Sequence, residues 1–106
     1  MKQLIWYLFA GTQGGETRLR MICILKREPM NAHVLAKRMA MDYKTITHHI
    51  RVMEKNSVIY SSSKGSYGRI YFMTEIFRAH WDDLMEIKTK IEEKRRRRRR
   101  KLGKSI

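Results

Sequence analysis

Basic and hydroxyl side chains recur at helical intervals between positions 43 and 55. Because each residue of an α-helix turns the chain by about 100°, these side chains would share one side of a helix. A surface of hydrogen-bond donors and cations can bond to nucleic-acid phosphates, to guanine O6 and N7 and to other base edges. An ordinary solvated helix face is the alternative, although no acidic residue interrupts this side before Glu54. The candidate contacts in this segment are Tyr43, Lys44, Thr47, His48, Arg51 and Lys55.

The opposite side of the same segment carries the residues that would anchor it in a core. That predicted buried stripe consists of Ile46, His49, Ile50 and Met53. We expect His49 to be a histidine at the edge of the core rather than a ligand. Asp42 stands where the N-cap of this helix belongs.

A shorter helix is predicted directly before it, over residues 32–39, with Asn31 as the N-cap. Leu35, Ala36 and Met39 would form its inward face. Only a short turn separates the two predicted helices. A helix, a short turn and a second helix make up the helix-turn-helix motif.

Two β-prone runs, 57–63 and 69–73, follow and flank a glycine-containing turn, which predicts a hairpin. A basic hairpin directly after a reading helix is typical of a wing that contacts phosphates or the adjacent minor groove. Alternatively, the hairpin only closes the core through Ile70 and Phe72. The candidate contacts at its tip are Lys64, Tyr67 and Arg69.

A further helix is predicted over residues 16–27, ending before Pro29. Its inward arc consists of Arg18, Met21, Ile22 and Leu25, with Leu19 at the edge. Cys23 lies off this arc, and nothing near it in sequence indicates an activated thiol. The glycines of residues 11–15 lack the spacing of a phosphate-binding loop, so they are interpreted as a linker or a turn.

The last predicted helix covers residues 75–93, with Thr74 as its cap. It carries more apolar surface than a small three-helix core can cover, which predicts a dimer interface. The alternative is a helix that folds back across its own domain. The candidate interface residues are Ile76, Phe77, His80, Trp81, Leu84, Ile87 and Ile91.

The charge balance favours a polyanionic partner. The chain has 106 residues, with 24 Lys and Arg against 10 Asp and Glu, and a net charge of +14. Residues 94–101 are eight consecutive cations. Like charges at helical spacing oppose helix formation, so a solvated, disordered end is one interpretation of residues 94–106. Whether the last helix continues into the arginine run or frays before it stays open. Non-specific contact with polyanions is predicted through Arg95–Arg100.

The N-terminal run LIWYLFA, residues 4–10, is seven apolar residues long. A membrane-spanning helix needs roughly 20. We therefore expect this run to be buried in the core or in a subunit interface, as part of an arm over residues 1–15; shallow membrane contact is disfavoured. A strand, a helical turn and an interface arm all remain open for it.

The sequence indicates a cytoplasmic protein associated with the nucleoid.

The run LAKRMAMDYKTITHHIRVMEKNSVI, residues 35–59, resembles ArsR/MarR-type winged helix-turn-helix regulators, and is most similar to archaeal members. With the GGETR start at residues 14–18, the resemblance covers roughly residues 11–74. It implies that the helix containing THHI enters the major groove. Ser57 departs from the glycine usual in that family, so Asn56 is expected to take the left-handed conformation instead. The one cysteine and four histidines form no metal-ligand set of the metal-sensing members.

Together these features predict a mainly α fold with a small β-hairpin, namely a winged helix-turn-helix domain over 16–74 followed by a long dimerisation helix. The expected function is that of a homodimeric transcriptional regulator that binds double-stranded DNA in a sequence-specific manner. The alternative is an architectural nucleic-acid binder driven by the arginine tail. No catalytic arrangement or phosphate loop is present in the sequence, so we expect no enzyme activity and no cofactor.

Overall fold

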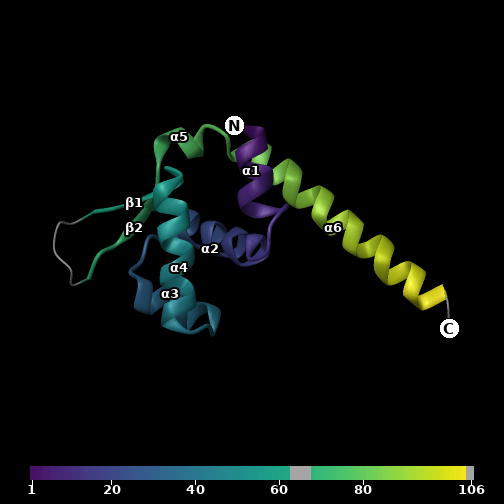
Figure 1. The fold of residues 1–106 in the computed structure, drawn as a ribbon, viewed down its shortest axis with the longest axis horizontal. Coiled ribbons are helices and arrows are strands. Elements are labelled where there is room, and N and C mark those ends of the chain that lie inside the picture. Colours follow the sequence, from purple (N-terminus) through teal and green to yellow (C-terminus); the bar gives the residue numbers. More distant parts are fainter. Residues whose placement is uncertain (63–67, 105–106) are drawn as a thin grey trace.

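The structure is a computed structural model that describes residues 1–62 and 68–104 (Figure 1). The described part contains six helices and one two-stranded antiparallel sheet, which confirms the predicted fold class. The elements in chain order are α1 (Lys2–Phe9), α2 (Gly15–Arg27), α3 (Ala32–Met39), α4 (Tyr43–Lys55), β1 (Ile59–Ser61), β2 (Tyr71–Met73), α5 (Glu75–Arg78) and α6 (Trp81–Lys104).

Three side chains start helices where the sequence predicted caps. The Asn31 carboxamide accepts a hydrogen bond from the Val34 amide at 2.8 Å, which opens α3. The Asp42 carboxylate accepts from two amides of the first turn of α4. The Thr74 hydroxyl accepts from the Phe77 amide at 3.1 Å, which opens α5. Each cap satisfies amides that have no partner inside the helix, so these helices begin at their predicted residues.

The N-terminal run forms helix α1, one of the forms that its sequence left open. Ile5, Leu8 and Phe9 are buried on one side of it, and the ring of Phe9 lies 5.7 Å from that of Phe77. Trp6 and Tyr7 on the other side remain 50% and 58% exposed. Thus α1 supplies a wall of the core and also presents aromatic surface to solvent.

The hairpin is shorter than predicted. Ile59 pairs with Met73 and Ser61 with Tyr71, and Met30 adds an isolated bridge to Tyr71 from the segment before α3. This bridge ties the base of the wing to the helix-turn-helix. The predicted contacts Lys64 and Tyr67 lie outside the described residues.

The predicted helix over 75–93 is divided, because the chain bends at Ala79 and His80 between α5 and α6. The prediction of a single apolar stripe along this segment is therefore wrong in part. Ile76 points away from the core and is 63% exposed. Phe77, Leu84 and Ile87 are buried within the chain. The sequence prediction counted a core of three helices, whereas α1 also packs against α6 and helps to cover this surface.

One local expectation is also corrected, and one open question is answered. Ser57 itself adopts the left-handed conformation with φ of 59°, whereas Asn56 has φ of −99°. The arginine tract continues α6 up to Lys104, a point on which the sequence left both outcomes open. Arginine has high helix propensity, and cations near a helix C-terminus interact favourably with the helix dipole, which opposes the mutual repulsion.

Candidate nucleic-acid interface

The outward side of α4 is as cationic as its spacing predicted. Lys44, His48, Arg51 and Lys55 are exposed, while Ile46, His49, Ile50 and Met53 are buried. Thr47 is half-buried, and its hydroxyl donates a hydrogen bond to the carbonyl oxygen of Lys44 at 3.0 Å. The helix therefore presents long basic side chains and one imidazole, and the Thr47 hydroxyl oxygen keeps lone pairs to accept a further bond.

Tyr43 lies at the edge of this surface, 45% exposed. Its ring stacks on His33 of α3, with the ring centroids 4.2 Å apart and the planes at 22°. Sequence reasoning missed His33, because a contact between the first turns of two helices depends on their crossing angle. Spacing within either helix carries no signal of that angle.

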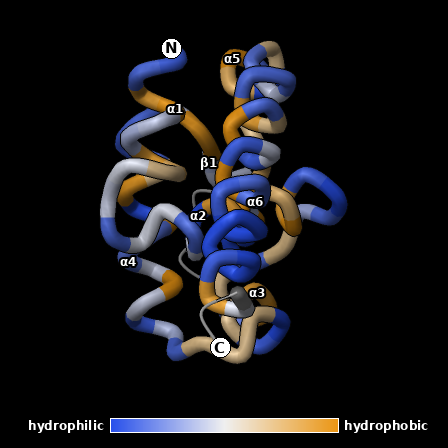
Figure 2. The backbone as a smooth tube through the Cα atoms, turned by 90° about the vertical axis from the view of Figure 1, so that its right-hand side faces the viewer, coloured by the Kyte–Doolittle hydropathy of each residue, from blue (hydrophilic) through white to orange (hydrophobic). Residues whose placement is uncertain are grey.

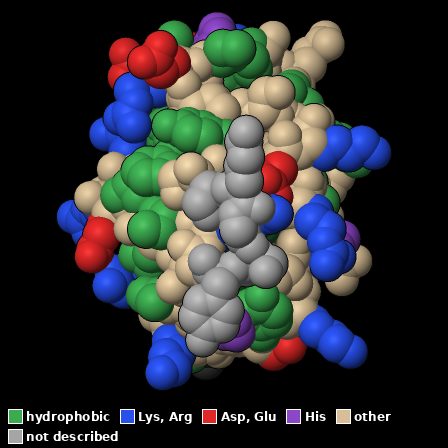
Figure 3. All heavy atoms as spheres, turned by 90° about the vertical axis from the view of Figure 1, so that its left-hand side faces the viewer, with side chains coloured by type: hydrophobic (Ala, Val, Ile, Leu, Met, Phe, Trp, Pro, Cys, Tyr) green, Lys and Arg blue, Asp and Glu red, His purple; other side chains and the backbone are tan. Residues whose placement is uncertain are grey.

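The base of the wing meets this corner of the helix-turn-helix. A hollow of about 230 Å³ is lined by residues from the starts of α3 and α4 and from the wing, including His33, Tyr43 and Arg69. The structure thus brings two of the predicted contacts, Arg69 and Tyr43, to one hollow. Viewed from the wing end, Lys and Arg side chains surround this face of the molecule (Figure 3).

A buried arginine contacts the side of α4 that faces the core. Arg18 is 4% exposed, and its Nε donates to the Leu8 carbonyl oxygen at 2.8 Å while Nη2 donates to Thr12 Oγ1 at 2.9 Å. Its Nη1 lies 3.2 Å from Nδ1 of His49. Because a guanidinium only donates, Nδ1 accepts, and His49 is therefore neutral with its proton on Nε2. One side chain links the end of α1, the turn after it and α4.

The position of His49 at the core edge is as predicted, and its surroundings suppress its charge. Burial lowers the pKa of His49 below its ordinary value, and the neighbouring Arg18 and His48 act in the same direction. Burial also lowers the pKa of Arg18. A Cβ atom added to Gly14 would lie 2.8 Å from Cε1 of His49, so the ring packs directly on that glycine.

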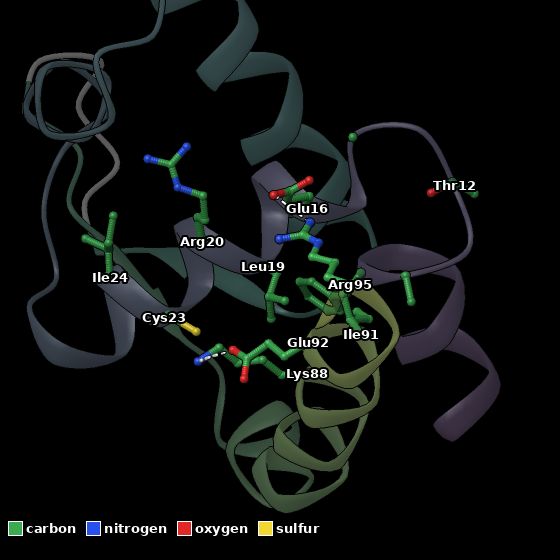
Figure 4. Close-up of a pocket in the computed structure, with 13 residues that line it drawn as sticks. Thr12, Glu16, Leu19, Arg20, Cys23, Ile24, Lys88, Ile91, Glu92 and Arg95 are labelled. Atoms are coloured by element: carbon green, nitrogen blue, oxygen red, sulfur yellow. Dashed lines mark ion pairs between the residues drawn. The ribbon is translucent and has the colours of Figure 1, made fainter. Parts of the chain in front are cut away.

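A groove of about 650 Å³ lies on another side of the molecule, between α2 and α6 (Figure 4). Arg95 pairs with Glu16 across it at 2.6 Å, and Lys88 pairs with Glu92 within α6 at 3.5 Å. The half-buried Cys23 lines it, and burial raises the pKa of that thiol, which opposes formation of a reactive thiolate.

Within residues 1–62 and 68–104, no three His, Cys, Asp or Glu side chains lie close enough to hold a metal ion. Over the same residues, no helix is both long enough and apolar enough to cross a bilayer.

The remaining predicted interface residues share one level of exposure. His80, Trp81 and Ile91 are half-buried. His80 Nδ1 lies 3.4 Å from an oxygen of Asp83, and the Lys26 ammonium lies 4.7 Å above the Trp81 ring. These contacts are within one chain.

The sequence model of the family described as "Methanogenesis regulatory protein FilR1, N-terminal domain" matches residues 9–74, which span α2, the helix-turn-helix and the wing. The chain belongs to this family. No curated protein matches it.

Solved structures resemble the FilR1-family chain over most of its length. A probable transcriptional regulator from Pseudomonas aeruginosa superposes with a TM-score of 0.65 at 16% identity, covering 99% of this chain and 88% of the other. A predicted DNA-binding transcriptional regulator from E. coli gives 0.61 at 17% identity, covering 80% and 86%. HlyU from Vibrio cholerae gives 0.63 at 16%, covering 81% and 90%. At such identities the likeness establishes the fold alone.

Proposed function

We propose that this chain is a transcriptional regulator that binds double-stranded DNA in a sequence-specific manner as a homodimer. The observation that carries the proposal is the outward side of α4, where Lys44, His48, Arg51 and Lys55 are exposed beside a buried apolar stripe. The names of the family and of two of the structural neighbours describe regulators and support the same conclusion. The site of action would be the nucleoid in the cytoplasm.

In this proposal α4 enters the major groove, which is wide enough for a helix, and the wing lies on the backbone or in the adjacent minor groove. Lys and Arg would bond to phosphates or guanine, and Thr47 and His48 to base edges. The proposed contacts are Tyr43, Lys44, Thr47, His48, Arg51, Lys55, Lys64, Tyr67 and Arg69.

The apolar surface that the single chain leaves uncovered supports a dimer. Trp6, Tyr7 and Ile76 are each at least half exposed, and Trp81 and Ile91 are half-buried. Exposed aromatic patches of this kind mark interaction sites. To read a two-fold-symmetric site, a dimer formed through α1 and α6 must place its two α4 helices about 34 Å apart.

The deciding experiment selects bound duplexes from a random pool and then measures affinity for the enriched sequence. Arg51→Ala and His48→Ala should each weaken that binding by about 1–3 kcal/mol per lost base contact. Arg27→Ala, an exposed arginine at the end of α2, serves as the matched control and should change it little. If both α4 variants bind the enriched duplex as tightly as the unaltered chain, the proposed reading surface is refuted.

A second candidate function is that of an architectural binder, and the exposure of every described side chain from Lys94 to Gly103 favours it. Binding through the tract Arg95–Arg100 would be independent of DNA sequence. Its log affinity would fall by about 0.9 per neutralised phosphate for each tenfold rise in salt concentration. Enrichment of a symmetric motif would count against this alternative. Absence of enrichment, with affinity lost when Arg96–Arg100 become glutamine, would favour it.

A further inference from the structure

The C-terminal end of α6 is cationic on every side. Residues 94–104 contain nine Lys and Arg and no Asp or Glu, and residues 94–103 are all exposed. Six consecutive arginines, each turned by about 100° from the last, leave no side of the helix neutral. We call residues 94–104 the arginine helix. Figure 2 shows its strongly hydrophilic turns in contrast to the apolar turns of the helices behind it.

Such a helix has no apolar stripe to pack on a protein core, and its charge favours a polyanionic partner. The major groove of a duplex is about 12 Å wide, and a helix with its side chains is about 10–12 Å across. Eleven residues span about 16 Å, a length over which a duplex carries about ten phosphate charges. Setting aside Arg95, which pairs with Glu16, the other eight cations are close to that number, which favours a double-stranded nucleic acid.

The arginine helix is anchored at its base. Arg95 pairs with Glu16 of α2 at 2.6 Å, and the preceding Ile91 is half-buried against the core. Near the start of α6, Asp83 lies 4.0 Å from Lys2 of α1. The buried Leu84 and Ile87 of the same helix fix the direction in which α6 leaves the domain, and these ion pairs add to it.

That direction points away from the wing. The described residues extend 55 Å along the longest axis, with the hairpin at one end and the end of α6 at the other (Figure 1). We propose that the arginine helix engages a second duplex segment, distinct from the one on α4 and the wing, so that the protein bridges two segments of DNA. This inference rests on the proposed function for the first segment only.

A capture experiment with the full chain tests the bridge. A duplex enriched from the random pool is immobilised and saturated with protein, and a labelled duplex of unrelated sequence is then added. The unaltered chain should retain the second duplex. The triple variant Arg97→Gln, Arg98→Gln, Arg99→Gln should retain at least tenfold less of the second duplex. For three lost phosphate contacts, the slope of its log affinity against log salt concentration should be shallower by about 2.7. Glutamine keeps the helix propensity close to that of arginine.

The matched control removes three exposed arginines elsewhere, as Arg20→Gln, Arg27→Gln and Arg78→Gln, and should retain capture. Equal capture by both triple variants would overturn the bridge. A second result would also overturn the bridge. The unaltered chain would capture no second duplex, and the protected region on the immobilised duplex would be shorter with the Arg97–Arg99 variant than with the unaltered chain. The arginine helix would then lie on the same segment as α4.

The two proposals fail separately. Arg51→Ala tests recognition of the first duplex and leaves the arginine helix intact. If the random pool yields no enriched sequence, two arbitrary duplexes replace it. Capture that depends on Arg97–Arg99 then still supports the bridge, while the sequence-specific proposal fails; no capture overturns the bridge.

Discussion

The outward side of α4 and the arginine helix are both cationic, but they are built in opposite ways. In α4 the cations occupy one side, because Ile46, Ile50 and Met53 on the other side are buried. In the arginine helix the described side chains of residues 94–103 are all exposed. Packing sets the rotation of α4 about its axis, so each basic side chain has a defined direction. Only the base of the arginine helix is held, so its binding depends on the number of charges.

The largest effect should follow from breaking the buried stripe of α4. Ile46 is fully buried, and Ile46→Ala should lower the free energy of unfolding by about 2–5 kcal/mol, from lost apolar burial and the cavity left behind. Arg98→Ala should change it by less than about 0.5 kcal/mol, because the side chain is exposed. Urea unfolding followed by circular dichroism measures both. Similar losses in the two variants would contradict the comparison.

Two glycines give a second contrast between the same regions. Gly14 has φ of 88°, and an added Cβ would lie 2.8 Å from the His49 ring behind α4. Gly14→Ala should therefore cost about 2 kcal/mol from backbone strain, with the clash adding to it. Gly103 lies in the arginine helix with nothing within 4 Å of an added Cβ, so Gly103→Ala should raise helicity slightly. Thermal unfolding of both variants provides the measurement, and an unchanged midpoint for Gly14→Ala would refute the strain.

The sequence predicted the helix-turn-helix well, because its signals are local. Asn31 and Asp42 are side chains that cap helices, and the positions of the apolar residues in α4 follow the helical period. The expectation that failed for residues 75–93 depends on contacts distant in sequence. The surplus apolar surface of Phe77 and Leu84 is covered by helices from the other end of the chain, which periodicity within residues 75–93 does not reveal.

The candidate site divides in the same way. The outward direction of Arg51 and the burial of His49 follow from helical angles alone. The stacking of His33 on Tyr43 and the bond between Arg18 and His49 join separate helices, and their geometry depends on packing.

A smaller effect should follow from removing the cap of α4. The Asp42 carboxylate accepts from the amides of Lys44 and Thr45, at 3.1 and 3.3 Å, and from the Thr45 hydroxyl. Asp42→Ala should cost about 1 kcal/mol of stability and loosen the first turn of the helix, which carries Lys44. Asp42→Asn retains a capping oxygen and should recover most of the loss. Hydrogen exchange of the Lys44 and Thr45 amides locates the effect; equal protection in both variants would argue against the cap.

The smallest effect should be a dependence of stability on pH that belongs to α4 and is absent from the arginine helix. Burial holds the pKa of His49 below its ordinary value of 6.5, with Arg18 and His48 acting in the same direction. The unfolded chain therefore binds a proton at this position more readily than the folded chain. The contribution of neutral His49 is complete above about pH 6.5 and is lost as the pH falls through the lowered pKa, because Nδ1 can no longer accept from Arg18. His49→Gln should flatten the profile of unfolding free energy between about pH 7.5 and 5.5, whereas His48→Gln, at an exposed position, should leave most of it. If His49→Gln keeps the full slope, another group titrates in this range and the Arg18–His49 contact is not its source.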